Sequence, residues 1–255
     1  MSKRERPFDE ELTTLKQKLL EMAARAEEQI ALAIRGLQDR EEKLACQVLD
    51  REEAVNLMDV EIDEMGLRLL ALRQPLAADL RFITSAMKIS SDVERIGDLA
   101  VNIAERTIDL LKSPQLKPLI DIPHMALMAQ EMVRDALTAF VNGDDELARD
   151  VCERDDKVDQ LNDQVFRELL TYMMQDPGTI ARAVDLILVG RHLERIADHA
   201  TNIGEDVIYM VRGKTIKHHI EEGRATGPKG CAGGGREPHG QKPWESQGIR
   251  KAGDR

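Results

Sequence analysis

Two short passages of this sequence place oxygen-bearing side chains at helical spacing. The passage ERIGDLAVNIAER occupies residues 94–106, and ERIADHATNIGED occupies residues 194–206. At 100° per residue the acids and amides of each passage gather on one side of a helix. They are Glu94, Asp98, Asn102 and Glu105 in the first passage, and Glu194, Asp198, Asn202 and Glu205 in the second. Carboxylate and amide oxygens are hard ligands that suit Mg²⁺, Ca²⁺, Mn²⁺ or iron. The candidate metal ligands in these passages are Glu94, Asp98, Asn102, Glu194, Asp198 and Asn202.

The same residues also fit a solvated outer face of a helical bundle. An apolar stripe of Val93, Ile96, Ala100 and Ile103 lies nearly opposite the first acidic set, as expected for an amphipathic helix. Acids four residues apart repel each other by a few tenths of a kcal/mol, which favours a positive charge between them. Spacing alone therefore leaves both interpretations open, a solvated face and a metal-binding face.

A further acidic ladder precedes the second passage. It consists of Asp155, Asp159 and Asp163 at four-residue steps. A weaker counterpart, with Glu52, Asn56 and Asp59, precedes the first passage. Asp155 and Asp159 repeat the four-residue spacing of Glu94 with Asp98 and of Glu194 with Asp198.

His192 and His199 flank the acids of the second passage, where the first passage has Asp92 and Leu99. Because they occur in one copy only, we interpret them as surface histidines. Arg95 and Arg195 follow the two glutamates, and we expect them to form ion pairs.

Helical periodicity runs through most of the chain, and strand alternation is nearly absent. Proline and glycine clusters such as QP, SPQLKPLIDIP, NGDD and QDPGT separate the apolar-periodic segments. Six helices are predicted in two groups of three, over about 8–37, 41–73, 76–112, 124–141, 145–174 and 179–212.

The two groups are copies of one another. DREEAVNLMD from Asp50 aligns with ERDDKVDQLN from Glu153 at an offset of 103, and VERIGDLAVNIAE aligns with LERIADHATNIGE at an offset of 100. An internal repeat of this length predicts a duplicated structural unit. We therefore predict an all-α fold of two tandem three-helix bundles, at residues 8–112 and 124–212, joined by a linker at 113–123.

The last segment, residues 213–255, contains ten glycines and no apolar period. This composition predicts a disordered C-terminal tail.

Composition narrows the function. With 47 acidic and 36 basic residues the net charge is −11, which argues against nucleic acid as a partner and favours cations or basic protein surfaces. No apolar run is long enough to span a bilayer and the first residues lack a signal-peptide core, so we expect a cytoplasmic protein without membrane insertion. The three cysteines are far apart and suggest neither a disulfide framework nor a zinc site. No Gly-rich phosphate loop is present, which argues against nucleotide hydrolysis.

The paired ERIGD and ERIAD passages, the following NIAE and NIGE, RQPLAADLRF at 73–82 and MMQDPGTI at 173–180 together resemble the PhoU family of phosphate-signalling proteins. The resemblance covers about residues 8–218. It implies a cytoplasmic, homodimeric, non-enzymatic regulator that represses the phosphate-starvation (Pho) response. Such a protein would link the ATPase subunit of the phosphate ABC transporter to a phosphate-sensing histidine kinase. Some relatives bind iron or other metals through Glu/Asp-x-x-x-Asp pairs, although no cofactor is required. The resemblance therefore implies metal ligands at Glu94 with Asp98, Glu194 with Asp198 and Asp155 with Asp159, and Asn102 and Asn202 are additional candidate ligands.

Two other classes of protein stay open. The first is a carboxylate-bridged metal protein or enzyme, but its ligands would project inside a bundle with a Glu-x-x-His pair. Here the acids lie opposite the apolar stripes, and no Glu-x-x-His occurs. The second is a purely structural dimerisation module, which would bind no metal and have no role in phosphate control.

Overall fold

The computed structural model describes residues 7–214, and every regular element in that part of the chain is helical. The elements are α1 (Pro7–Asp39), α2 (Glu42–Leu49), α3 (Glu52–Arg73), α4 (Ala77–Leu111), α5 (Asp121–Asn142), α6 (Asp145–Gln175), the short 3₁₀ helix η1 (Pro177–Thr179) and α7 (Ile180–Arg212). The predicted all-α fold with two repeats is confirmed. Of the predicted tail, only Gly213 and Lys214 fall among the described residues, and residues 215–255 lie outside them.

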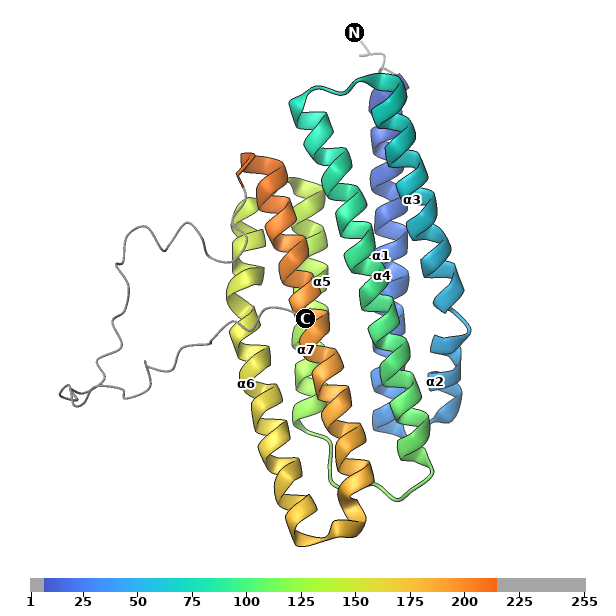
Figure 1. The fold of residues 1–255 in the computed structure, drawn as a ribbon, viewed down its shortest axis with the longest axis vertical. Coiled ribbons are helices and arrows are strands. Elements are labelled where there is room, and N and C mark those ends of the chain that lie inside the picture. The colour runs from blue at the N-terminus through green and yellow to red at the C-terminus, as the bar shows by residue number, and fades with distance from the viewer. Residues whose placement is uncertain (1–6, 215–255) are drawn as a thin grey trace, which may run out of the picture. The chain divides into compact units, whose positions relative to one another are not determined.

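The helices form two layers (Figure 1). In one layer α6, α7, α4 and α3 lie side by side in that order, and α5 and α1 pack behind them. The first repeat consists of α1 to α4 and the second of α5 to α7. Because α4 and α7 occupy the middle of the layer, they join the two repeats along their length. The free side of this layer is the four-helix face, on which the helices carrying the two acidic passages are neighbours.

One predicted helix is wrong in detail. The segment expected as a single helix over 41–73 is divided into α2 and α3 by a turn at Asp50 and Arg51. The Arg51 N–H donates to the carbonyl oxygen of Val48 at 3.1 Å, three residues back, so the α-helical ladder is interrupted there. Neither glycine nor proline lies near this turn, since the only glycine of the segment, Gly66, is well inside α3, and the sequence pattern therefore gives no signal for the turn.

The predicted ends of the other helices agree with the structure to within a few residues. The helix α3 stops at Arg73, just before Gln74 and Pro75, and Gln74 takes a left-handed conformation with φ of 47°. Gly143 ends α5 with φ of 65°, and the Asp144 side chain then caps α6 by accepting from two backbone N–H groups. The helix α5 begins at Asp121, before the expected residue 124. Pro123 falls in its first turn, where a helix needs no proline N–H.

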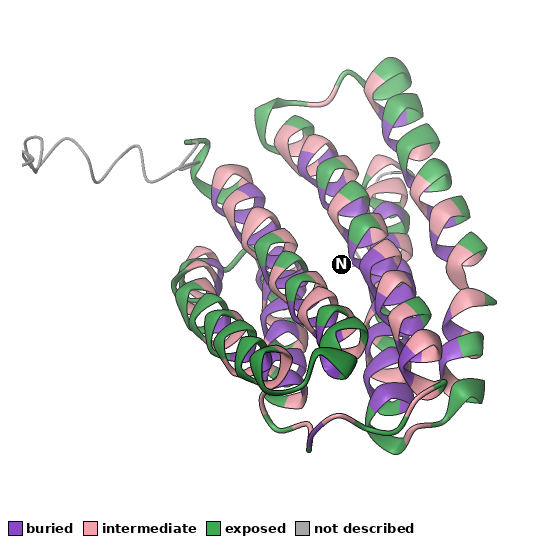
Figure 2. Ribbon diagram, turned by 60° about the horizontal axis from the view of Figure 1, so that its bottom comes forward, coloured by how far each residue is buried: buried purple, intermediate pink, exposed green. Residues whose placement is uncertain are grey.

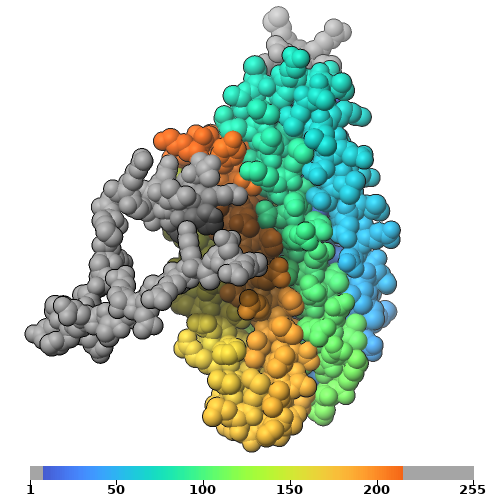
Figure 3. Space-filling model, in the orientation of Figure 1, coloured from blue at the N-terminus to red at the C-terminus, as the bar shows by residue number. Residues whose placement is uncertain are grey.

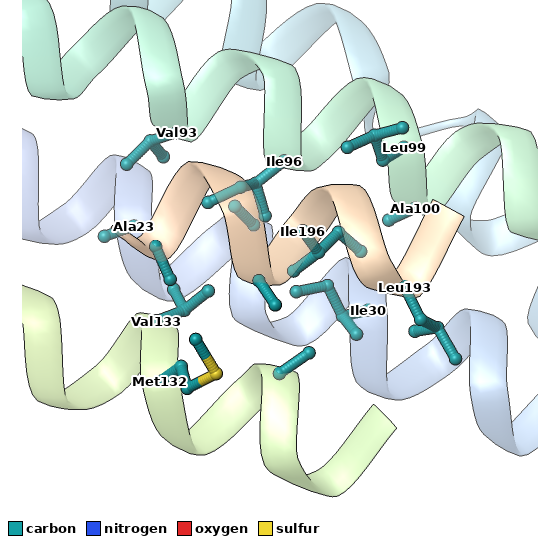
Figure 4. Packing of buried hydrophobic residues seen from close by; sticks show 14 of the residues in the cluster. Ala23, Ile30, Val93, Ile96, Leu99, Ala100, Met132, Val133, Leu193 and Ile196 are labelled. Atoms are coloured by element: carbon teal, nitrogen blue, oxygen red, sulfur yellow. The ribbon is translucent and has the colours of Figure 1, made fainter. Parts of the chain in front are cut away.

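The core is built mainly from Leu, Ile, Val, Ala and Met. Buried residues form one side of each helix and exposed residues the other (Figure 2). The stripe residues Val93, Ile96 and Ala100 of α4 are fully buried, and Leu193 and Ile196 are their counterparts on α7 (Figure 4). One core cluster runs through both repeats, so the duplicated units pack as a single body over residues 7–214.

Arg40 closes the end of the first repeat. It has a left-handed backbone with φ of 55° directly after α1. Its guanidinium donates to the carbonyl oxygen of Ser113 at 2.6 Å and, at 3.4–3.5 Å, to those of Leu110 and Leu111. These carbonyls lie at the C-terminus of α4, where a helix leaves its last acceptors unpaired. One side chain thus joins the ends of α1 and α4.

Glycines allow close approach of helices in each repeat. A Cβ on Gly204 of α7 would lie 2.9 Å from the backbone oxygen of Ala148 in α6. A Cβ on Gly66 of α3 would lie 2.6 Å from the sulfur of Met87, the end of a flexible side chain. The first contact involves backbone and cannot yield without moving a helix.

Candidate functional site

The acidic ladder of α6 faces the acids of α7. We call Asp155, Asp159, Asp163, Glu194 and Asp198 together the α6–α7 acidic surface. Its contact between helices is direct, since the Nδ2 of Asn162 in α6 donates to the Oε2 of Glu194 in α7 at 2.7 Å. Asn162 fits there because Gly190 opposite has no side chain; a Cβ at that position would lie 2.8 Å from the Asn162 Oδ1. The structure thus brings four predicted ligands to one surface: Asp155, Asp159, Glu194 and Asp198.

Burial and neighbouring negative charges disfavour the ionised form of the carboxylates on this surface. Burial, followed by the negative charge of Asp198, raises the pKa of Asp155 from 3.8 to about 6. Burial also raises the pKa of Asp159, Glu194 and Asp198, and Asp198 adds its repulsion to the first two. Such a cluster binds protons more tightly than isolated carboxylates and is stabilised by any cation that approaches it.

The first repeat carries an equivalent surface between α3 and α4. We call Asp59, Asp63, Glu94 and Asp98 the α3–α4 acidic surface. Burial, then the charge of Asp98 and, more weakly, that of Asp59, raises the pKa of Glu94. Burial and Asp59 raise the pKa of Asp63. Arg95 offsets part of this charge, with its Nη1 3.3 Å from Asp98 and its Nε 3.4 Å from Glu94. Arg95 thus forms ion pairs as expected, but with acids of its own helix.

The donor chemistry of both surfaces fits a hard cation. One oxygen of Asp59 and one of Asp155 are buried without a hydrogen-bonding partner in the described part of the chain. A buried carboxylate oxygen without a donor is costly, and a metal ion or a cationic side chain would supply what it lacks. The carboxylates are spread along the helices, however, and no three His, Cys, Asp or Glu side chains within residues 7–214 already converge as a metal-binding group.

Asn202 and the two histidines lie between the repeats. The Nδ1 of His199 on α7 is 2.8 Å from the Oδ1 of Asp92 on α4, and both side chains are more than four-fifths buried. The Nδ2 of Asn202 donates to the same oxygen at 3.4 Å. The structure thus directs Asn202 towards α4 and away from the α6 ladder. Asn102 occupies the equivalent position on α4, partly buried one turn beyond Asp98.

The interpretation of His192 and His199 as surface residues is wrong. His192 is partly buried, and its Nδ1 is enclosed with no partner among residues 7–214. Burial, assisted by Arg195, Arg106 and Arg191, lowers the pKa of His192. This burial could not be predicted from helical spacing, because the position of a residue around its helix does not say which neighbouring helix covers it.

Charged pairs hold the same junction together. The Nζ of Lys88 on α4 lies 3.2 Å from the Oδ1 of Asp206 on α7, and Asp206 is 3% exposed. The Nη1 of Arg106 on α4 lies 3.4 Å from the Oδ1 of Asp185 on α7. In both pairs α4 supplies the cation and α7 the acid, which fixes how the two central helices are placed against each other.

Comparison with known proteins agrees with this architecture. The family model described as PhoU domain matches residues 19–107 and again residues 122–207, one match in each repeat. The chain belongs to the PhoU family.

Two PhoU relatives extend the match over most of the chain. The phosphate-specific transport system accessory protein PhoU homolog of Aquifex aeolicus (strain VF5) is 44% identical over 213 residues, covering 83% of this chain and 96% of the relative. The protein of the same description from Pseudomonas aeruginosa is 42% identical, covering 83% of this chain and 88% of the relative.

Solved PhoU structures share the fold. The crystal structure of PhoU from Pseudomonas aeruginosa superposes with a TM-score of 0.79 at 42% identity, covering 81% of this chain and all of that one. The phosphate transport system regulatory protein PhoU from Streptococcus pneumoniae gives a TM-score of 0.77 at 30% identity, covering 82% and 99% of the two chains. Within residues 7–214 no helix is long and apolar enough to cross a membrane.

The contact between Asn162 and Glu194 has no identical counterpart in the first repeat, and the sequence pattern did not predict it. Asn162, which holds Glu194, has Asp59 as its counterpart at the offset of 103. The first repeat therefore has a carboxylate at the position where the second repeat has an amide. The alignment of DREEAVNLMD with ERDDKVDQLN contained this difference, but only the contact with Glu194 shows that it alters the charge of the surface.

Proposed function

We propose that this protein is a cytoplasmic, homodimeric accessory protein of phosphate transport and a negative regulator of the phosphate-starvation regulon. It acts by binding and not by catalysis, linking the ATPase subunit of the phosphate ABC transporter to the phosphate-sensing histidine kinase. The observation that supports this most strongly is the match of both repeats to the PhoU domain, together with relatives described as phosphate-specific transport system accessory proteins.

The geometry suits an adaptor. The four-helix face carries two related acidic surfaces, one from each repeat, and one hydrophobic core runs through both repeats. The two surfaces are similar in plan but differ in residues such as Asp59 and Asn162. A duplicated surface that has diverged can bind two different partners at once, as a link between a transporter and a kinase requires.

Deleting the gene tests this function directly. We expect alkaline phosphatase activity to rise in phosphate-rich medium, and to fall again when the wild-type gene is restored. Unchanged repression in the deletion strain would contradict the regulatory role and favour a purely structural dimerisation module. A pull-down with tagged protein at high and low phosphate should recover the transporter ATPase and the sensor kinase.

Metal binding is a second proposed property, supported by the unpaired buried oxygen of Asp155 and the raised pKa values around it. Asp155, Asp159, Glu194 and Asp198 would hold the ion in the second repeat. Glu94 and Asp98 would do so in the first. A bound Mg²⁺, Ca²⁺, Mn²⁺ or iron would neutralise the repelling carboxylates and tie the paired helices together.

The metal content of the purified protein tests this property. Changing Glu94, Asp98, Glu194 and Asp198 to Ala should lower the metal content, whereas Glu153→Ala, an exposed acid elsewhere on α6, should leave it unchanged. Equal metal content in the wild type and both variants would mean that these acids form a solvated face and not a metal site.

A further inference from the structure

The α6–α7 pair changes character along its length. On α6, large apolar side chains at four-residue steps continue the acidic ladder towards the end of the helix. They are Phe166, Leu170 and Met174, with exposures of 48%, 43% and 78%. At 3.6 residues per turn, positions 155, 159, 163, 166, 170 and 174 lie within one broad stripe of the helix surface. The stripe is thus acidic in its first half and apolar in its second.

The helix α7 repeats this change in the opposite chain direction. Ile180 and Val184, exposed by 45% and 42%, share the helix side that carries Glu194 and Asp198 further on. The acidic halves of the two helices meet, as the hydrogen bond from Asn162 to Glu194 shows. The apolar halves therefore both lie towards the connection through η1, which is at the lower end of the yellow and orange region in Figure 3.

The first repeat lacks most of this apolar half. At the repeat offsets, Phe166 corresponds to Asp63 and Val184 to Thr84. Leu170 and Ile180 correspond to Leu67 and Leu80, which are 59% and 43% exposed. At the offset of 103 Asp163 corresponds to Val60, which is 55% exposed, so the first repeat also exposes apolar side chains, but Asp63 and Thr84 interrupt them. The second repeat has apolar side chains at the positions of Asp63 and Thr84 as well, and grouped exposed apolar residues mark an interaction site.

We propose that the α6–α7 surface binds an amphipathic helix of a protein partner, apolar at one end and rich in Lys or Arg at the other. The proposal rests on the adaptor function and assigns one of its two binding surfaces. Phe166, Leu170, Met174, Ile180 and Val184 would anchor the apolar end, in the manner of a helix laid onto an apolar surface. The basic end would lie over Asp155, Asp159 and Asp198.

Charge complementarity decides the chemistry of the partner. The protein's own cations compensate this charge only in part. The Nη2 of Arg167 is 3.4 Å from Asp163, with both side chains more than 70% exposed. Arg191 and Arg195 on α7 act against the raised pKa of Glu194 and of Asp198, respectively, but burial still keeps both pKa values raised. The unpaired buried oxygen of Asp155 still lacks a donor. The stripe from Asp155 to Met174 is about 29 Å long at 1.5 Å per residue, which matches a partner helix of about 19 residues.

A designed peptide tests the proposal. The probe is a fluorescent 20-residue helical peptide with Leu at helical spacing in one half and Lys in the other, titrated with the full chain in EDTA and followed by anisotropy. We expect saturable binding that weakens as salt is raised. A peptide with Glu in place of Lys should bind at least about tenfold more weakly, because its charge is wrong for the acidic half.

The repeat supplies a matched control. Leu170→Ser with Ile180→Ser removes two anchors of the proposed surface, and Leu67→Ser with Leu80→Ser makes the same change at the equivalent positions of the first repeat. The first pair should weaken peptide binding about tenfold or more, and the second pair should leave it unchanged. All four positions are exposed, so circular dichroism should show both variants folded as the wild type.

Three results would overturn the proposal: equal affinity for the Lys and Glu peptides, equal loss in both variant pairs, or no saturable binding. Purified transporter ATPase and sensor kinase separate this failure from that of the adaptor function. If the wild type binds neither protein, the adaptor function is wrong. If the wild type binds them and the Leu170→Ser, Ile180→Ser variant binds both equally well, the assignment of the α6–α7 surface is wrong.

Discussion

Replacing Gln29 with methionine should make this protein more stable. Gln29 lies on α1 with 1% exposure, and neither Nε2 nor Oε1 has a hydrogen-bonding partner among residues 7–214. Its Oε1 lies beside Gly97 of α4, 3.1 Å from the site a Cβ would take. At the repeat offset of 103 the second repeat has Met132, which is fully buried. The two repeats thus pack a polar and an apolar side chain of similar size into equivalent core positions.

The magnitude follows from the unpaired amide. Burying an amide without a partner costs about 1–3 kcal/mol in proteins, and methionine fills nearly the same volume, so neither a cavity nor overpacking should cancel the gain. We expect Gln29→Met to raise the free energy of unfolding by about 1–3 kcal/mol. For a body of this size that corresponds to roughly 3–10 °C in melting temperature.

Urea unfolding followed by far-UV circular dichroism measures this change. The reciprocal variant, Met132→Gln, should lower the free energy of unfolding by a similar amount, because it introduces the same unpaired amide in the second repeat. If Gln29→Met is no more stable than the wild type, the amide is satisfied in the folded protein and the reasoning fails.

Other substitutions test the charges, the caps and the close contacts. Because burial and Asp198 raise the pKa of Asp155 from 3.8 to about 6, wild-type stability should fall as pH rises through that interval. Asp155→Asn should therefore stabilise the metal-free protein by about 1–3 kcal/mol above about pH 7 and by little near pH 4, while Glu153→Gln shows no such pH dependence in urea unfolding. Arg40→Ala should cost about 1–3 kcal/mol in urea unfolding by releasing the carbonyls at the end of α4, and Arg40→Gly should cost less because glycine accepts the positive φ. Gly204→Ala should lower the melting temperature, because the added Cβ meets the backbone of α6. Gly66→Ala should not lower it, because the added Cβ meets only the flexible Met87 side chain. Equal changes in melting temperature would contradict this difference between the two contacts.

The sequence predicted the helices well where local chemistry sets their ends. Pro75 and Gly143 stop or redirect the backbone by their own conformational limits, so the ends of α3 and α5 could be read directly. The turn at Asp50 could not be predicted, because it depends on how α2 and α3 each pack against α1 and α4 and not on a residue that breaks helices.

The positions of the candidate site residues could likewise be predicted only where they depend on one helix alone. The helical spacing of 100° per residue correctly placed Glu94, Asp98, Glu194 and Asp198 away from the apolar stripes, because that placement depends on periodicity within one helix. It could not place His199 or Asn202, because both point towards α4, a helix one hundred residues away in the chain.

By itself the sequence determined the helical fold, its duplication and the presence of acidic stripes, because each follows from residue type and spacing within a helix. The tertiary structure decided which stripes meet. It brought the ladder of Asp155 and Asp159 against Glu194 and Asp198, buried two histidines at the junction of the repeats, and set the exposed apolar end of α6 beside that of α7. These pairings depend on which helices are neighbours in the layer, and packing of the whole core sets that order.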